Sequence, residues 1–97
     1  MAVQDSQVFV LPVHMTVDKV QDIREQIVEF LQTAGKQIKC ISNEVQEVDA
    51  AGLQLLLSMY KAIVKDGGKM VIVNPSQELK KVITYSGADK VFRLEES

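Results

Sequence analysis

The stretch EVDAAGLQLLL, residues 47–57, predicts the start of a helix and one side that this helix buries. Asp49 is typical of a helix N-cap, because its carboxylate accepts hydrogen bonds from backbone N–H groups of the first turn. Ala50 and Ala51 would then lie on that turn, where the N–H groups and the helix dipole favour anions. An alanine side chain neither binds an anion nor does chemistry. The sequence therefore raises the question of what this helix start contributes.

Strands and helices are expected to alternate on both sides of this stretch. Short runs rich in β-branched and apolar residues predict strands at 8–13, 37–41 and 69–73, with 42–48 as a connection. Pro12 cannot donate a ladder hydrogen bond, so the first strand should end there or lie at an edge. The run KMVIV at 69–73 is apolar enough for a strand that is central in its sheet or covered on both faces.

Apolar residues at spacings of three and four predict three amphipathic helices. Their expected buried sides are Val20, Ile23, Ile27, Phe30, Leu31 and Ala34; then Leu53, Leu56, Leu57, Tyr60, Ile63 and Val64; then Leu79, Val82 and Ile83. A short strand or helical turn at 91–94 completes the chain. The order predicts a single domain over 1–97, of class α/β, with a mixed, mostly parallel sheet of four to five strands and three to four helices.

Local signals also predict where the helices begin and end. Thr16 is expected to cap the first helix. Asn74 and Pro75 are expected to begin the third helix, with Gln77 reaching back as in a capping box. The expected stops are Gly35, the Asp66-Gly67-Gly68 turn and Gly87.

Composition argues against several functional classes. The net charge is −2, with 11 basic and 13 acidic residues, so nucleic-acid binding is not expected. Cys40 is the only cysteine, which excludes an intrachain disulfide and a CxxC site, and we expect it to be buried. The N-terminal residues lack the features of a signal peptide, and no apolar run is long enough to span a membrane. We therefore expect a cytoplasmic protein that is not inserted in the membrane.

The sequence shows no set of residues that would support catalysis. His14 is the only histidine, so a metal site would lack a second imidazole, and phosphate-binding glycine motifs are absent. We expect no enzymatic activity, no catalytic residue, no metal ion and no cofactor.

Residues 48–57, VDAAGLQLLL, resemble the signature of the STAS domain, a family named for sulfate transporters and anti-sigma factor antagonists. Members of the antagonist branch carry Asp, then Ser or Thr, a small residue and Gly-Leu at a helix start. The likeness continues to Glu95 through a helix, a Gly-Gly turn, a strand, a capped helix and a Ser-Gly stop. The matching positions are Asp49, Ala50, Ala51, Gly52 and Leu53.

The resemblance implies that this helix start binds a protein partner. In the antagonist branch, a partner kinase that is also the anti-sigma factor phosphorylates the hydroxyl after the Asp. The added charge acts as a switch on the contact surface. Ala50 holds that position here and has no oxygen to accept a phosphoryl group. The resemblance thus implies partner binding through the five positions without phosphorylation, by an anti-sigma factor resembling a histidine-kinase ATPase or by a transporter ATPase.

One upstream segment departs from the family pattern. The family often has Gly-x-x-Asp after its early strand, whereas this chain has PVHMTVD at 12–18, with Thr16 near the Asp position. This departure bears on how a sigma-regulating kinase would fit.

Several readings remain open at this level. The chain is either a phosphorylation-independent interaction module in sigma regulation or chemotaxis-type signalling, or an accessory subunit of a lipid-transporting ABC system. An enzyme of an unrecognised kind is the third alternative. In a purely structural reading, Ala50, Ala51 and Gly52 are small only because the helix packs closely against a strand. A homodimer and a small-molecule ligand are also left open.

Overall fold

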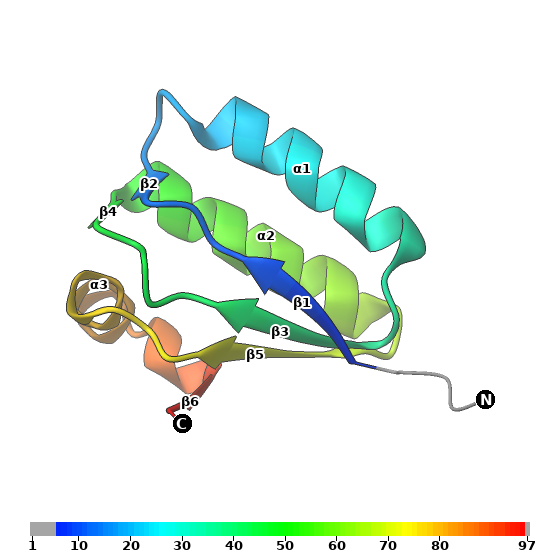
Figure 1. Cartoon of the computed structure of the whole chain (residues 1–97). Coiled ribbons are helices and arrows are strands. Elements are labelled where there is room, and N and C mark those ends of the chain that lie inside the picture. The colour runs from blue at the N-terminus through cyan, green and yellow to red at the C-terminus, as the bar shows by residue number, and fades with distance from the viewer. Residues whose placement is uncertain (1–5, 97) are drawn as a thin grey trace.

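The computed structural model describes residues 6–96 and has the expected α/β architecture, with three α-helices and a four-stranded sheet (Figure 1). The elements are β1 (Ser6–Val10), β2 (His14–Met15), α1 (Val20–Thr33), β3 (Gln37–Ile41), β4 (Glu47–Val48), α2 (Ala50–Lys65), β5 (Lys69–Val73), α3 (Gln77–Ser86), the 3₁₀ turn η1 (Ala88–Lys90) and β6 (Arg93–Glu95). The last strand confirms the strand alternative for the end of the chain.

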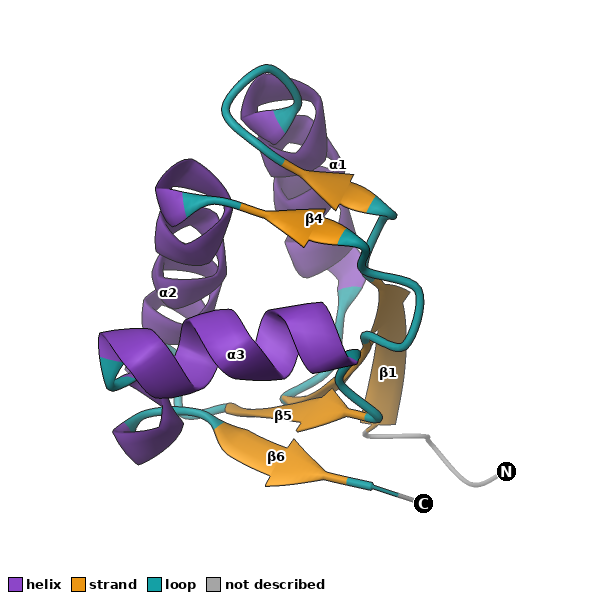
Figure 2. Ribbon diagram, turned by 90° about the vertical axis from the view of Figure 1, so that its left-hand side faces the viewer, coloured by secondary structure: helices purple, strands orange, loops and turns teal. Residues whose placement is uncertain are grey.

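The main sheet has the strand order β1-β3-β5-β6, and every neighbouring pair is parallel. Its register aligns Val10 with Ile41, Ile41 with Val73, and Val73 with Glu95. All three helices lie on the same side of this sheet (Figure 2). The inward-facing strand residues pack there, so Phe9, Ile38, Cys40, Met70 and Ile72 are buried.

A second, two-stranded sheet was not expected from the sequence. The strand predicted at 8–13 ends at Val10, and β2 pairs in parallel with β4, which lies inside the predicted connection 42–48. Two-residue strands are too short to produce a period-two pattern, so the sequence carries no signal for them. This small sheet matters because β4 leads directly into α2.

The burial of β5 and α2 differs in part from the prediction. The strand β5 lies inside the sheet as expected, but only Met70 and Ile72 are buried, and the opposite face is partly exposed. In α2, Leu56 is fully buried as predicted, whereas Val64 is 43% exposed. Leu55 and Met59 are buried instead, because α2 packs against α1 as well as against the sheet. A helix covered from two sides buries more than one narrow stripe.

The second helix begins and ends as predicted, and the other two begin elsewhere. Asp49 caps α2, and Gly87 ends α3 in the left-handed conformation at φ 81°. The N-cap of α1 is Lys19, not Thr16, and its C-cap is Ala34, not Gly35.

The cap of α3 is Ser76, whose hydroxyl accepts a hydrogen bond from the N–H of Leu79 at 3.1 Å. The predicted cap Asn74 instead has a φ of 52°, so it forms part of the turn, and Pro75 and Gln77 do not form the predicted capping box. The hydroxyl of Ser76, two residues after Asn74, supplies the capping oxygen instead, so the helix begins at Gln77.

Across residues 6–96, none of the helices combines the length and the apolar character needed to cross a membrane.

Candidate functional site at the start of helix α2

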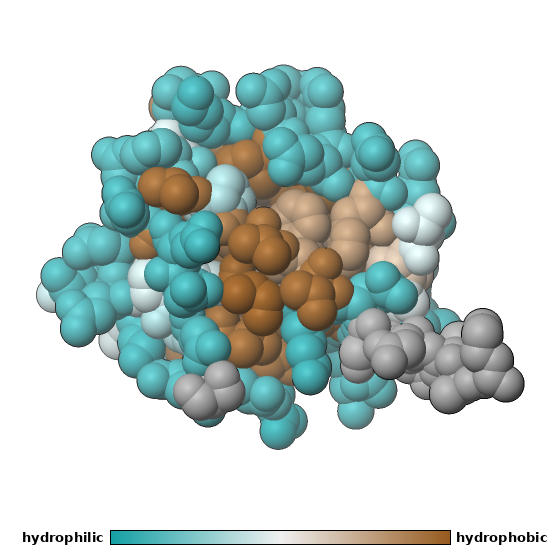
Figure 3. Space-filling model, viewed as in Figure 1, coloured by the Kyte–Doolittle hydropathy of each residue, from teal (hydrophilic) through white to brown (hydrophobic). Residues whose placement is uncertain are grey.

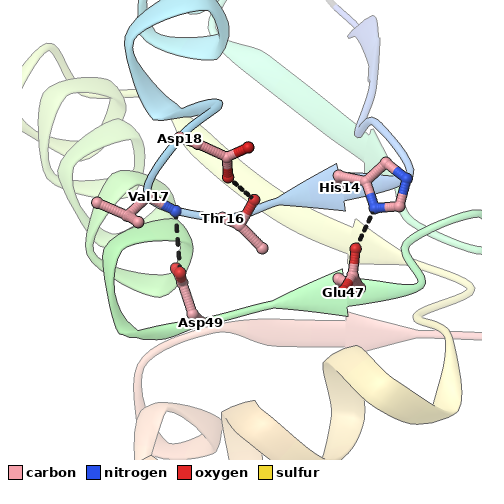
Figure 4. A network of polar contacts seen from close by, with 6 residues as sticks. All are labelled: His14, Thr16, Val17, Asp18, Glu47 and Asp49. Atoms are coloured by element: carbon pink, nitrogen blue, oxygen red, sulfur yellow. Dashed lines mark hydrogen bonds and ion pairs between the residues drawn. The ribbon is translucent and has the colours of Figure 1, made fainter.

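The Asp49 carboxylate joins two segments that are distant in sequence. One oxygen accepts a hydrogen bond from the N–H of Gly52 at 3.0 Å, and this bond caps α2. The other accepts from the N–H of Val17 at 2.9 Å, in the loop between β2 and α1 (Figure 4). Both bonds stabilise the charged carboxylate, so they lower the pKa of Asp49, with the Gly52 N–H as the larger cause. One side chain thus holds the helix start against the loop.

Gly52 is required by a close approach of the backbone. A Cβ atom at this position would lie 2.0 Å from the carbonyl oxygen of Met15 in β2. Leu53, the next residue, is also buried, with 9% of its surface exposed. At these two positions the structure shows close packing, because Gly52 has no room for a side chain and the Leu53 side chain is almost fully buried.

The exposed part of the site is small and largely apolar. Ala50 is exposed, while Asp49 and Ala51 are half-buried. Val17, whose N–H bonds Asp49, is 69% exposed and adds an isopropyl group to the same region. The sequence reasoning did not select Val17, although it lies in the segment 12–18 that departs from the family pattern. The departure of this segment from the family pattern was the sequence signal that could have identified Val17.

Polar side chains flank this region. The hydroxyl of Thr16 donates a hydrogen bond to Asp18 at 2.5 Å, which lowers the pKa of Asp18, and the backbone N–H of Asp18 lowers it further. The imidazole of His14 contacts the carboxylate of Glu47 across the β2–β4 sheet, and both side chains are exposed (Figure 4). Within residues 6–96, no group of three or more His, Cys, Asp or Glu side chains is placed to hold a metal ion.

The single thiol lies away from this surface. Cys40 is completely buried in β3, as expected, and burial raises the pKa of its thiol to about 12. A thiol with so high a pKa is a poor nucleophile, since the reactive form is the thiolate. The exposed part of the helix start presents short apolar side chains with a charged border.

Comparison with known proteins identifies the family. The profile of the STAS domain matches residues 1–97, and the chain belongs to this family. A protein of Thermotoga maritima named as an anti-sigma factor antagonist is 23% identical over 66 residues. That alignment covers 68% of this chain and 58% of the relative, so the match spans less than two thirds of the relative's length.

Solved structures show the same fold at low sequence identity. A crystal structure of a Thermotoga maritima protein that is named as an anti-sigma factor antagonist superimposes with a TM-score of 0.84 at 18% identity, covering 100% of this chain and 84% of that chain. The anti-sigma factor antagonist SpoIIAA in its unphosphorylated form gives a TM-score of 0.78 at 21% identity, again covering 100% and 84%. The chain is therefore a STAS domain with an anti-sigma factor antagonist-like fold.

Proposed function

We propose that this chain is a non-enzymatic interaction module of bacterial regulation that binds a protein partner through the start of α2. The contact surface consists of Asp49, Ala50, Ala51 and Val17, and phosphorylation does not switch it at the usual position. The observation that carries the proposal is that Ala50, which holds that position, is exposed on a turn that Asp49 fixes. Gly52 and Leu53 are buried beneath this surface and hold the first turn of α2 against the domain.

The absence of a hydroxyl determines the kind of regulation. SpoIIAA has been solved in unphosphorylated and phosphorylated forms. A phosphate adds about two negative charges at pH 7, which changes a contact surface strongly. The methyl group of Ala50 cannot accept a phosphoryl group, so the surface stays in its binding form at all times. Such a module acts as an antagonist that is always active or as a scaffold, and its regulation comes from its own concentration or from its partner.

The partner class that we propose is a cytoplasmic ATPase. An anti-sigma factor that resembles a histidine-kinase ATPase is the first choice, because SpoIIAA is an anti-sigma factor antagonist and the Thermotoga maritima relative carries that name. A neighbour from the sulfate transporter family has the same fold and supports the transporter alternative. The chain itself would then be cytoplasmic.

The test begins with affinity capture from the source cell and continues with calorimetry on the captured partner. Replacement Ala50→Glu should weaken binding by roughly a hundredfold or more, because burying a carboxylate without a counter-ion costs several kcal/mol. Folding should change little, since the helix dipole favours a negative charge in the first turn. The matched control is Ala62→Glu, the same change at an exposed position near the other end of α2, and it should leave the affinity unchanged.

Two results would contradict the proposal. Equal affinity of wild type and Ala50→Glu, both folded by their melting curves, would show that the helix start serves only packing. Intact-mass measurement of the cellular protein that finds a stoichiometric phosphate controlling partner binding would refute the constitutive mechanism. Capture of a lipid-transporting ABC ATPase would instead assign the module to a transporter.

A further inference from the structure

Within residues 6–96, no element covers the face of the main sheet that points away from the helices. The register places Val8, Lys39, Val71 and Arg93 in one row across the four strands, and Val10, Ile41, Val73 and Glu95 in the next. Val8 is 54% and Val10 57% exposed, and no helix or loop among residues 6–96 packs over them. A hydrophobic area surrounded by hydrophilic residues lies over β1 and β3 (Figure 3). This open sheet face presents aliphatic side chains on the side of the sheet opposite the core.

The open sheet face is positively charged although the chain is negative overall. Lys39 and Lys69 make no ion pair with any residue in the range 6–96, and Arg93 pairs with Glu95 at 3.5 Å. The net charge of the chain is −2, so a concentration of cations on one face is a local property. These three cations, with Glu95 as the one acidic residue, line a groove of about 450 Å³ beside the β5 edge, to which α2 also contributes. The strand β6 covers this edge only from Val71 to Val73.

The size of the open sheet face indicates whether it binds a second copy of this chain or a single helix of a partner. Three strands of five residues and β6 of three, spaced about 4.8 Å apart with about 3.3 Å per residue, give an area of at most some 14 by 16 Å. A stable dimer buries about 800 Å² on each partner, which is several times more. A helix is about 10 Å wide, and three turns are about 16 Å long, so one short helix fits the face.

We propose that the open sheet face binds an acidic amphipathic helix of a partner protein. The apolar side of that helix packs on Val8, Val10, Ile41 and Val73, and its carboxylates lie beside Lys39, Lys69 and Arg93. This binding surface is separate from the start of α2. The domain therefore carries two surfaces, which is the property that a scaffold in a regulatory assembly needs.

The experiment uses two synthetic 14-residue helical peptides that have the same leucine stripe. One carries glutamates on both flanks of the stripe, and the other carries lysines at the same positions. Each peptide is titrated into the ¹⁵N-labelled full chain, and backbone amide shifts are followed. The acidic peptide should shift the signals of Val8, Lys39 and Val71 most, whereas the basic peptide should give no saturable change.

Variants distinguish electrostatic recognition from nonspecific hydrophobic binding. Lys39→Glu should weaken binding of the acidic peptide about tenfold, because a like charge then faces the peptide carboxylates. The matched control Lys61→Glu makes the same change at an exposed position of α2 and should leave the affinity unchanged. Melting curves verify that both variants are folded, and Val10→Thr, which removes apolar surface without a charge, should also weaken binding.

Three outcomes would overturn the proposal. The first is binding of both peptides with equal affinity, or amide shifts confined to other surfaces. The second is a dimer in sedimentation equilibrium that Lys39→Glu disrupts, which would assign the face to a second copy. The third is binding to vesicles of anionic phosphatidylglycerol that is abolished by Lys39→Glu, without any binding of the acidic peptide. That result would assign the face to a lipid surface.

Discussion

The helices α2 and α3 begin with the same capping contact but are anchored in different ways. In α2, Asp49 accepts from the N–H of Gly52 at 3.0 Å, and in α3, Ser76 accepts from the N–H of Leu79 at 3.1 Å. The second oxygen of Asp49 also accepts from Val17, which lies 32 residues earlier. Ser76 reaches a distant segment only through its backbone, where its N–H donates to the carbonyl of Ser42 at 3.1 Å.

This difference shows that only the α2 start is linked to a distant segment through a side chain. The position of α3 relative to the sheet is held by backbone hydrogen bonds, which survive any substitution except proline. The α2 start has such a backbone bond as well, from the N–H of Asp49 to the carbonyl of Met15 at 3.2 Å, but its link to the loop at Val17 runs through one carboxylate. Since Ala50 and Val17 are the exposed parts of the proposed partner-binding surface, the geometry of that surface depends on the residue at position 49.

The largest expected effect comes from Gly52→Ala at the α2 start. The new methyl group would lie 2.0 Å from the backbone oxygen of Met15, so β2 or α2 must move. We expect the free energy of unfolding to fall by roughly 3 kcal/mol or more. Chemical denaturation measures the change.

The control for this prediction is Gly87→Ala at the end of α3. No heavy atom lies within 4 Å of a Cβ there, and only the φ of 81° opposes the side chain. A cost of about 1 kcal/mol is expected. Equal costs at the two glycines would show that the α2 start tolerates a shift and is not tightly held.

The next largest effect is expected from Asp49→Ala. It removes the acceptor for two backbone N–H groups, whereas Ser76→Ala removes the acceptor for one. The melting temperature should fall by about 10 °C, roughly twice the loss for Ser76→Ala. Calorimetric melting curves of the two variants give the comparison. A loss no larger than that of Ser76→Ala would mean that the bond to Val17 contributes nothing to stability.

Replacement Asp49→Asn removes the bond to Val17 together with the negative charge, and the contribution of that charge is visible as a pH dependence. The amide oxygen can still cap α2, but the amide nitrogen cannot accept from the Val17 N–H. The pKa of Asp49 is lowered in the folded chain, and its unfolded value is about 3.9. The stability from its charge is therefore complete above about pH 5 and is lost as the pH falls through 3.9 toward the folded pKa.

The wild type should accordingly melt higher than Asp49→Asn at pH 7, and the gap should shrink as the pH is lowered from 5 to 2. The carboxyl of Asp18, whose pKa is also lowered, titrates in both proteins and cancels in the difference. A gap that stays constant across this pH range would rule out a stabilising role for the charge of Asp49.

A smaller effect is expected at the α3 start. Ser76→Ala should cost about 1 kcal/mol, the ordinary value for loss of one N-cap hydroxyl. Because the Ser76 N–H still bonds Ser42, the orientation of α3 should persist, and amide shifts in β6 should not change. Widespread shifts in β6 would show that the side chain also positions this helix.

The parts of the fold that could be predicted are those with local causes. The strands β3 and β5 occupy the predicted residues, and the Asp49 cap follows from chemistry within one helical turn. The hydrogen bond from Val17 to Asp49 could not be predicted, because it depends on the pairing of β2 with β4, which are two residues long. Of the two alternatives that KMVIV predicted, the position inside the sheet is confirmed and the cover on both faces is not, since aliphatic residues also occupy the open sheet face.

The smallest expected effect is that of Ala50→Ser. This variant tests whether the α2 start differs from the phosphorylatable site of the family only by the missing hydroxyl. The position is exposed on the first turn, where a serine hydroxyl meets water, so the free energy of unfolding should change by less than about 0.5 kcal/mol. Affinity for the captured partner should stay within about twofold, because the hydroxyl adds no charge.

If the partner is a kinase-type anti-sigma factor, incubation of the Ala50→Ser variant with it and ATP should produce a singly phosphorylated chain by intact-mass measurement, and that form should bind weakly. Wild type in the same reaction is the control and should gain no phosphate at residue 50. A variant that binds normally but is never phosphorylated by such a partner would show that Val17 and the loop 16–18 have also diverged. In that case the surface differs from a phosphorylatable one by more than a single missing oxygen.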